Sequence, residues 1–276
     1  MLPVGKWRAE GNRKLIKRDI VIGIFAAAAL TVQAARPALS GEIPAVRDAP
    51  APENILFLGN SFVQRNNGLH NHLRKLTQSV FTANSEAYYF EAMTTLGARL
   101  SLHARTAGDT IKNHQHQKKT GPWDLVVLQG QSREPIYELA AGGFKEAARQ
   151  LDETIRNSGS RTAFFMTWAP KTKPELAKPL SDAYTRVGNE LSALVVPVGL
   201  AFHMARDRDP WMELYNRDKR HSSVLGTYLA ANVFFATLYG KSPVGASYTA
   251  GLSRKEAKFA QNTAWKTVQN YFEKYP

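Results

Sequence analysis

The sequence predicts an α/β fold, namely a three-layer α/β/α sandwich with a mainly parallel five-stranded sheet. From Asn54 onward, short apolar runs alternate with helical segments, which is the order of elements in such sandwiches. Most of the apolar runs are continuous, as expected for parallel strands that are covered on both faces. The chain has 276 residues, of which 43% are hydrophobic, and this is enough for one large domain with a packed core.

The apolar runs give five predicted strands and the segments between and after them give five predicted helices. The strands are Ile55–Leu58, Ala87–Met93, Leu125–Gln129, Ala163–Thr167 and Val195–Val198. The helices are Gly68–Phe81, Phe144–Asn157, Leu176–Leu194, Ser223–Tyr239 and Arg254–Tyr275. Ser253 and Glu256 have the spacing of a capping box at the start of the last helix. In sheets of this kind, functional sites gather beyond the carboxyl ends of the strands.

Residues 1–34 have the order of regions that is typical of a signal peptide. A basic stretch ends at Asp19, and the apolar run Ile20–Val32 follows it. Val32 and Ala34 suit the −3 and −1 positions of a cleavage site. The apolar run has 13 residues, fewer than the roughly 20 of a spanning helix. We therefore expect an exported protein, periplasmic or extracellular, that stays at the membrane only if this segment is uncleaved.

Between the predicted signal peptide and the predicted domain, residues 35–52 form a leader rich in proline and alanine. Four prolines and few apolar side chains indicate a flexible or extended segment. The predicted domain covers residues 53–276. It contains no internal repeat.

The charge of the chain bears on its partners. The net charge is +13, and residues 1–34 contribute +4 with six Lys/Arg and two Asp/Glu, which leaves +9 after cleavage. For an exported protein, this favours an anionic envelope polymer over nucleic acid as a partner, although a generally basic exterior is the alternative. The chain has no cysteine, which excludes disulfides, thiol catalysis, cysteine metal sites and a lipoprotein anchor.

The first predicted strand ends in a glycine turn that delivers a serine. In the stretch "NILFLGNSFVQRNNG", the strand runs into Gly59-Asn60-Ser61. Such a turn can serve the topology alone, or it can hold a nucleophile at the edge of the sheet. A serine hydroxyl becomes a good nucleophile only when a base takes its proton and a third group orients that base.

Among the seven histidines, His221 is the candidate base. Asp218 lies three residues before it, so its carboxylate can fold back onto Nδ1 and leave Nε2 to face a serine. Alternatively, Asp218 is a loop residue and His221 a residue at a helix start, where Ser222 or Ser223 can cap the helix. We expect five histidines in polar, exposed segments and one, His203, in a lining or core position; the five are His70, His72, His103, His114 and His116. No carboxylate shares the spacing of His114 and His116, so we predict no metal and no cofactor.

The developing negative charge of an ester transition state needs hydrogen-bond donors. Gly97 follows the second predicted strand and could offer a backbone N–H. Gln129 and Gln131 follow the third strand and could each offer a side-chain amide. The alternatives are a turn glycine and glutamines that satisfy loop backbone groups.

Taken together, these blocks resemble the SGNH (GDSL-like) hydrolase superfamily, in particular a branch with a G-N-S-F nucleophile block. The resemblance covers Asn54 to about Gly240 and implies a flavodoxin-like sandwich. It implies that Ser61 is the nucleophile, His221 the general base and Asp218 its orienting partner. It further implies an oxyanion hole made by the backbone N–H groups of Ser61 and Gly97 and the side chain of Gln131, with Gln129 as the second choice.

Three positions depart from the superfamily pattern. Asn60 stands where many members have aspartate, and Ser222 replaces a proline that often follows the histidine. Gln131 replaces an asparagine and reaches about one carbon–carbon bond farther, so the loop that carries it must be set back.

The function implied by the resemblance is hydrolysis of an ester through an acyl-enzyme. We expect an exported serine esterase whose substrate is a small-molecule or glycan ester, for example an O-acyl group on an envelope glycan. One alternative is an O-acyltransferase that uses the same triad. The other is a non-catalytic glycan-binding module on the same fold.

Overall fold

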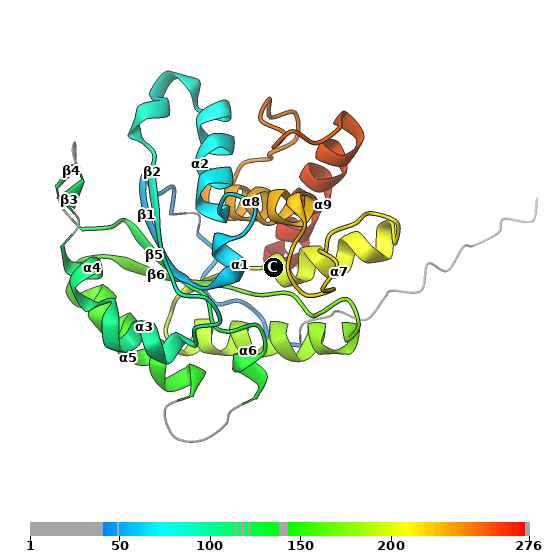
Figure 1. The fold of residues 1–276 in the computed structure, drawn as a ribbon. Coiled ribbons are helices and arrows are strands. Elements are labelled where there is room, and N and C mark those ends of the chain that lie inside the picture. The colour runs from blue at the N-terminus through cyan, green and yellow to red at the C-terminus, as the bar shows by residue number, and fades with distance from the viewer. Residues whose placement is uncertain are drawn as a thin grey trace, which may run out of the picture. The chain divides into compact units, whose positions relative to one another are not determined.

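The computed structural model describes residues 41–48, 50–113, 115–116, 119–120, 122–137 and 143–273 (Figure 1). The predicted signal peptide, residues 35–40 of the predicted leader and His114 lie outside the described residues. The described residues all belong to one compact unit.

Five parallel strands form the central sheet in the order β2-β1-β5-β6-β7. This is the strand order of flavodoxin-like sandwiches. The strands are β1 (Asn54–Gly59), β2 (Tyr89–Thr94), β5 (Leu125–Leu128), β6 (Arg161–Phe165) and β7 (Leu194–Val196). All five predicted strands are confirmed. The described residues also contain a small antiparallel hairpin of β3 (Gln115–His116) and β4 (Lys119–Thr120).

Helices cover both faces of the sheet (Figure 1). One face packs against α1 (Ser61–Gln64), α2 (Leu69–Val80), α7 (Val198–Arg208), α8 (Val224–Tyr239) and α9 (Arg254–Glu273). The other packs against α3 (Leu100–Thr106), α4 (Gly108–Lys112), α5 (Phe144–Asn157) and α6 (Ala177–Glu190). Short 3₁₀ helices lie at Thr82–Ala87, Glu134–Ile136 and Pro174–Leu176.

The continuous apolar run of β1 is explained by burial on both faces. Ile55 and Phe57 belong to the core beneath α8 and α9, whereas Leu56 and Leu58 belong to the core beneath α3, α5 and α6. All four side chains are fully buried. Because strand side chains alternate between faces, a strand covered on both sides needs apolar residues at every position. The predicted three-layer sandwich is therefore confirmed.

Several elements differ from the prediction. The predicted helix Leu176–Leu194 ends at Glu190, and Leu194 begins β7. The connection is tight because Gly188 lies against the strand, where an added Cβ would stand 2.3 Å from Val195 Cγ2. The last predicted strand ends at Val196, since Pro197 is the N-cap residue of α7, a helix that the sequence pattern did not predict.

The described part of the predicted leader lies against the domain. The backbone N–H of Gly41 donates to Asp182 Oδ1 at 2.8 Å, and that of Ala45 donates to Asn189 Oδ1 at 2.7 Å. Both acceptors belong to α6. Among the described helices, none combines the length and the apolar character that a membrane crossing needs.

Candidate active site

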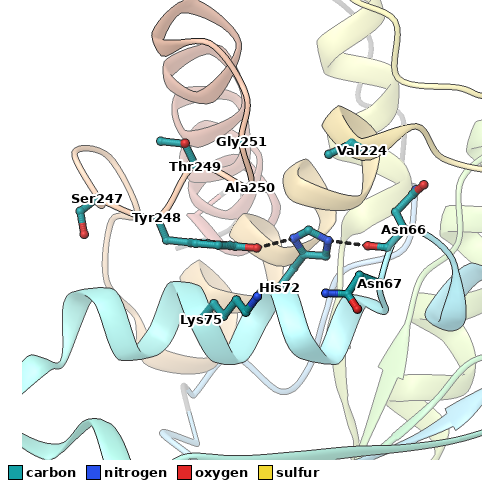
Figure 2. Close-up of a pocket in the computed structure, with 10 residues that line it drawn as sticks. All are labelled: Asn66, Asn67, His72, Lys75, Val224, Ser247, Tyr248, Thr249, Ala250 and Gly251. Carbon is teal, nitrogen blue, oxygen red and sulfur yellow. Dashed lines mark hydrogen bonds between the residues drawn. The ribbon is translucent and has the colours of Figure 1, made fainter.

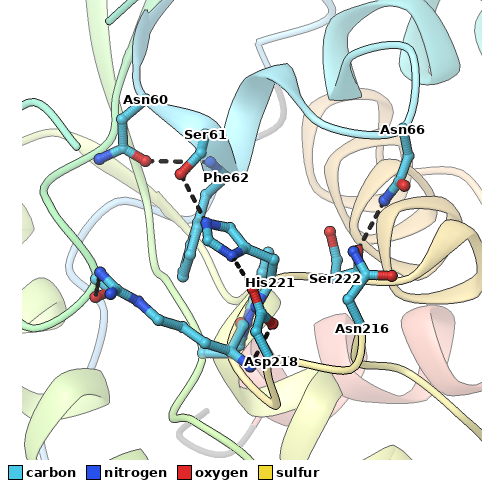
Figure 3. Close-up of polar contacts among 11 residues, drawn as sticks. Asn60, Ser61, Phe62, Asn66, Asn216, Asp218, His221 and Ser222 are labelled. Carbon is cyan, nitrogen blue, oxygen red and sulfur yellow. Dashed lines mark hydrogen bonds and ion pairs between the residues drawn. The ribbon is translucent and has the colours of Figure 1, made fainter. Parts of the chain in front are cut away.

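The side chains of Ser61 and His221 meet at the carboxyl edge of the sheet (Figure 3). Ser61 is the first residue of α1, directly beyond the end of β1, and His221 lies in the loop before α8. The distance from Ser61 Oγ to His221 Nε2 is 2.9 Å, although the residues are 160 positions apart in the sequence. The strand can turn sharply here because Gly59 has no side chain, since an added Cβ would stand 2.7 Å from both Gln129 Oε1 and Val63 Cγ2.

The carboxylate of Asp218 folds back onto the imidazole of His221. Asp218 Oδ2 lies 2.5 Å from His221 Nδ1, and Asp218 Oδ1 accepts hydrogen bonds from the backbone N–H groups of Arg220 and His221. Lys219 has a left-handed backbone with φ of 56°, which closes the turn. Desolvation opposes ionisation of Asp218, but the hydrogen bonds from the His221 side chain and from the two N–H groups outweigh it and lower the pKa to about 2. Asp218 is therefore a carboxylate at neutral pH.

Aromatic side chains support the loop that carries His221. The ring of Phe62 meets the imidazole edge-on, with centroids 5.5 Å apart, and stacks on Trp168 at 4.5 Å. Trp168 Nε1 donates a hydrogen bond to the carbonyl of Arg220 at 2.9 Å. Ser223 caps α8 by accepting a hydrogen bond from the N–H of Gly226. Packing and capping therefore hold the imidazole of His221 against the turn that carries Ser61.

Asn60 ties the turn that carries Ser61 to both neighbouring loops. Its Oδ1 accepts from the N–H of Phe62 at 3.1 Å, and its Nδ2 donates to the carbonyl of Ala98 at 3.0 Å. Its backbone N–H donates to Gln129 Oε1 at 2.9 Å. An aspartate in this place could cap α1 in the same way, but a carboxylate could not donate to Ala98. Asn60 thus fixes the position of the loop that contains Gly97 relative to Ser61.

The two candidate glutamines lie in different surroundings. Gln129 is buried, and its side chain holds the N–H of Asn60 and the carbonyl of Gly130. Gln131 is partly exposed, and its Oε1 accepts from the N–H of Arg133 at 3.3 Å. Within the described chain, Nε2 of Gln131 has no hydrogen-bond partner. Of the two, Gln131 therefore keeps a side-chain donor for a ligand.

The sequence pattern did not single out Glu134, which joins the two loops that carry the candidate oxyanion donors. Its buried carboxylate accepts a hydrogen bond from the backbone N–H of Gln131 at Oε2, 2.8 Å away, and shares the N–H of Leu100 between Oε2 at 3.1 Å and Oε1 at 3.2 Å. Burial raises the pKa of Glu134, against the opposite effect of these N–H groups and of Arg99. No motif marks this residue, because its role depends on two loops that only the folded sheet brings together.

Two histidines expected in exposed segments are buried, so that expectation was wrong for them. His103 is 1% exposed on α3, where Nε2 donates to the carbonyl of Gly59 at 2.8 Å. His72 is 6% exposed on α2. Burial lowers the pKa of both rings. A polar stretch of sequence does not reveal which helix positions face inward. His72 and His103 both face inward.

The remaining histidines do not form a metal site in the described part of the chain. His203 is partly exposed on α7, and its Nε2 lies 3.6 Å from Oδ2 of Asp207 on the same helix. Of the pair His114 and His116, the first lies outside the described residues and the second is described only as part of β3. Where side chains are described, no group of three or more potential metal ligands occurs.

This architecture is the fold of the SGNH (GDSL-like) hydrolases, and comparison with solved structures shows the same fold. A DUF4886 family protein from Bacteroides uniformis has 19% identity and a TM-score of 0.57, over 79% of this chain and 95% of that chain. A protein from Slackia heliotrinireducens described as an SGNH hydrolase has 22% identity and a TM-score of 0.51, over 67% and 97%. The acetyl xylan esterase AlAXEase has 13% identity and a TM-score of 0.53, over 66% and 98%. No protein-family model and no curated protein matches the sequence.

Proposed function

We propose that the protein is a serine esterase with Ser61, His221 and Asp218 as its catalytic triad. The contact between Ser61 Oγ and His221 Nε2, with Asp218 on the opposite ring nitrogen, is the observation that carries this proposal. The order nucleophile, base and orienting carboxylate is the arrangement that activates a serine hydroxyl. One structural neighbour, which is named as an acetyl xylan esterase, supports ester hydrolysis at the level of the reaction class.

The reaction follows from the positions of these groups. Ser61 Oγ attacks the ester carbonyl while His221 Nε2 takes the hydroxyl proton, and the negatively charged Asp218 stabilises the imidazolium. The tetrahedral intermediate collapses, the carbon–oxygen bond to the alcohol breaks, and His221 gives the proton to the departing alcohol. Water then attacks the acyl-enzyme with the same base, which releases the acid and restores Ser61.

The oxyanion would be held by the backbone N–H groups of Ser61 and Gly97 and by Nε2 of Gln131. Gly97 has a φ of +69°, a conformation that suits glycine, and the Asn60–Ala98 hydrogen bond ties its loop to the nucleophile turn. Glu134 holds the backbone of Gln131 from the other side. Each lost donor would cost on the order of a hundred- to a thousandfold in rate.

The substrate and the location belong to the same proposal. We infer export from the signal-peptide pattern of residues 1–34, and an O-acyl group on an envelope glycan as the substrate. The basic chain suits an anionic polymer, and one structural neighbour is named as an esterase of acetylated xylan. Neither a metal nor an organic cofactor is needed for this chemistry.

Hydrolysis of short p-nitrophenyl esters tests the proposal. The purified protein should release p-nitrophenol from p-nitrophenyl acetate, and Ser61→Ala should abolish turnover with little change in melting temperature. A Ser61→Ala variant that keeps its activity would show that another residue is the nucleophile.

A further inference from the structure

A pocket lies close to the loop that carries His221. It has a volume of about 650 Å³, within the range of ligand-binding pockets. The loop after α1, the first turns of α2, the start of α8 and the loop between α8 and α9 form its walls (Figure 2). The lining residues are Asn66, Asn67, His72, Lys75, Val224, Ser247, Tyr248, Thr249, Ala250 and Gly251.

The rim of the pocket is attached to both catalytic segments. Asn66 follows α1, the helix that starts at Ser61, and its Nδ2 donates to the carbonyl of Ser222 at 2.8 Å and to Thr227 Oγ1 at 2.7 Å. Figure 3 shows this side chain reaching the loop that carries His221. Val224, another lining residue, comes three positions after His221. A ligand in the pocket would therefore sit next to the catalytic loop.

The two loops on either side of the pocket are held in fixed positions by His72. Its Nε2 donates to the carbonyl of Asn66 at 2.6 Å, and its Nδ1 accepts from the hydroxyl of Tyr248 at 2.8 Å (Figure 2). Burial lowers the pKa of His72, so the ring stays neutral at pH 7 and keeps both bonds. Left-handed backbone occurs in both loops, at Asn66 and Asn67 and at Ala250. Conformations of this kind persist only where the surrounding structure holds them, and they cluster at ligand sites.

The chemistry of the lining favours a polar, negatively charged ligand. The ten lining residues include the ammonium group of Lys75 and no carboxylate. In the described part of the chain, Lys75 forms no ion pair, and the side chains of Asn67, Ser247 and Thr249 have no hydrogen-bond partner. Amide and hydroxyl groups match the hydroxyls of a sugar, and a lysine ammonium matches a carboxylate. The half-buried ring of Tyr248 adds an apolar surface.

We propose that this pocket binds a carboxylated sugar unit of an acylated glycan, next to the unit whose ester reaches Ser61. The inference rests on the proposed esterase function and names its substrate class: an acidic rather than a neutral polysaccharide. Lys75 would pair with the carboxylate, and Asn67, Ser247 and Thr249 would bind sugar hydroxyls.

Substrate selectivity provides the first test. The kcat/KM values of the full chain are measured for acetylated oligogalacturonate and for acetylated xylo-oligosaccharide, which is neutral. Wild type should prefer the acidic substrate, and Lys75→Ala should lower the acidic-to-neutral ratio by about tenfold, as expected for the loss of one charge-assisted hydrogen bond. Lys258→Ala removes the same charge from an exposed position on α9 and should leave the ratio unchanged. An equal ratio in wild type and Lys75→Ala would overturn the proposal.

Direct binding provides the second test and separates the pocket from the catalytic proposal. Ser61→Ala protein is titrated with unacetylated oligogalacturonate in a calorimeter, and the double variant Ser61→Ala/Lys75→Ala should bind it about tenfold more weakly. If wild type hydrolyses no ester but this Lys75-dependent binding is present, the esterase function is wrong and the acidic-sugar site stands. If esters are hydrolysed but oligogalacturonate does not bind, the esterase function stands and the acidic-sugar site is wrong.

Discussion

The side-chain amide of Asn60 donates a hydrogen bond to the backbone carbonyl of Ala98, 3.0 Å away. This bond joins the residue before Ser61 to the residue after Gly97. Ser61, the proposed nucleophile, and one of the candidate oxyanion donors are thereby fixed relative to each other. An aspartate in place of Asn60 has no amide group and cannot make this bond.

Asn60→Asp should lower kcat without unfolding the protein. The carboxylate would still cap α1 through the N–H of Phe62, but it would face the carbonyl of Ala98 with no proton to share. The Gly97 loop should then move away from the oxyanion position, and we expect a fall in kcat of roughly ten- to a hundredfold, less than the full loss of a donor. Steady-state kinetics and thermal melting measure the two effects; an unchanged kcat would mean that this bond does not position the loop.

Gln131→Ala should lower activity, whereas Gln129→Ala should lower thermal stability. Gln131 has an unpaired Nε2 in the described chain, so its truncation should cut kcat by about a hundredfold or more and leave the melting temperature almost unchanged. Gln129 is buried and holds the N–H of Asn60, so its truncation should lower the melting temperature. Paired kinetics and melting curves distinguish them. A larger loss of kcat in a stably folded Gln129→Ala variant would assign the donor role to Gln129.

Glu134 should act as a positioning residue through its hydrogen bonds to the N–H groups of Gln131 and Leu100. Oε2 accepts from both N–H groups, and the Leu100 N–H is shared with Oε1 at 3.2 Å, so a glutamine whose carbonyl oxygen takes the place of Oε2 keeps one bond to each N–H and loses only the second contact to Leu100. Glu134→Ala should therefore lower kcat about tenfold or more with little change in KM, whereas Glu134→Gln should restore most of it. Equal loss in both variants would show that the charge of Glu134, and not its hydrogen bonds, matters.

The raised pKa of Glu134 also predicts how stability depends on pH. Because burial raises this pKa in the folded state, the folded protein holds the proton more tightly than the unfolded chain does. The stability from this group is complete below its unfolded pKa, near 4.5, and is lost as the pH rises through the folded pKa. Glu134→Gln does not titrate, so the melting temperature of wild type minus that of the variant should fall between pH 4 and pH 7. A difference that is constant or rises would contradict the inferred shift.

The regular elements that build the sheet could be predicted because their signal is local. Continuous apolar runs marked the strands, and the segments between and after them marked α2, α5, α6, α8 and α9. Ser253 and Glu256 form the expected capping-box hydrogen bonds at the start of α9. The pattern missed α7 because the apolar run around Pro197 was predicted to continue as a strand as far as Val198, which is the first residue of α7. The short helices α3 and α4 carry too few apolar positions to show a helical period.

In the candidate site, too, the local contacts could be predicted and the long-range ones could not. Asp218 was expected to fold back onto His221, three residues away, and the structure contains this contact. The approach of His221 to Ser61 depends on the sheet order and became an expectation only through the resemblance to a family. Glu134 and His72 were not identified, because their roles come from loops that lie far apart in the sequence and meet only in the folded chain.

Covalent labelling shows whether Ser61 is the nucleophile. The full chain is treated with a fluorophosphonate, digested and analysed by mass spectrometry, with the Ser61→Ala variant as the control. We expect one phosphonyl adduct on Ser61 in the wild type, a parallel loss of esterase activity, and no adduct in the variant. A wild-type protein that hydrolyses esters while Ser61 stays unmodified, or that is labelled at another serine, would contradict this expectation.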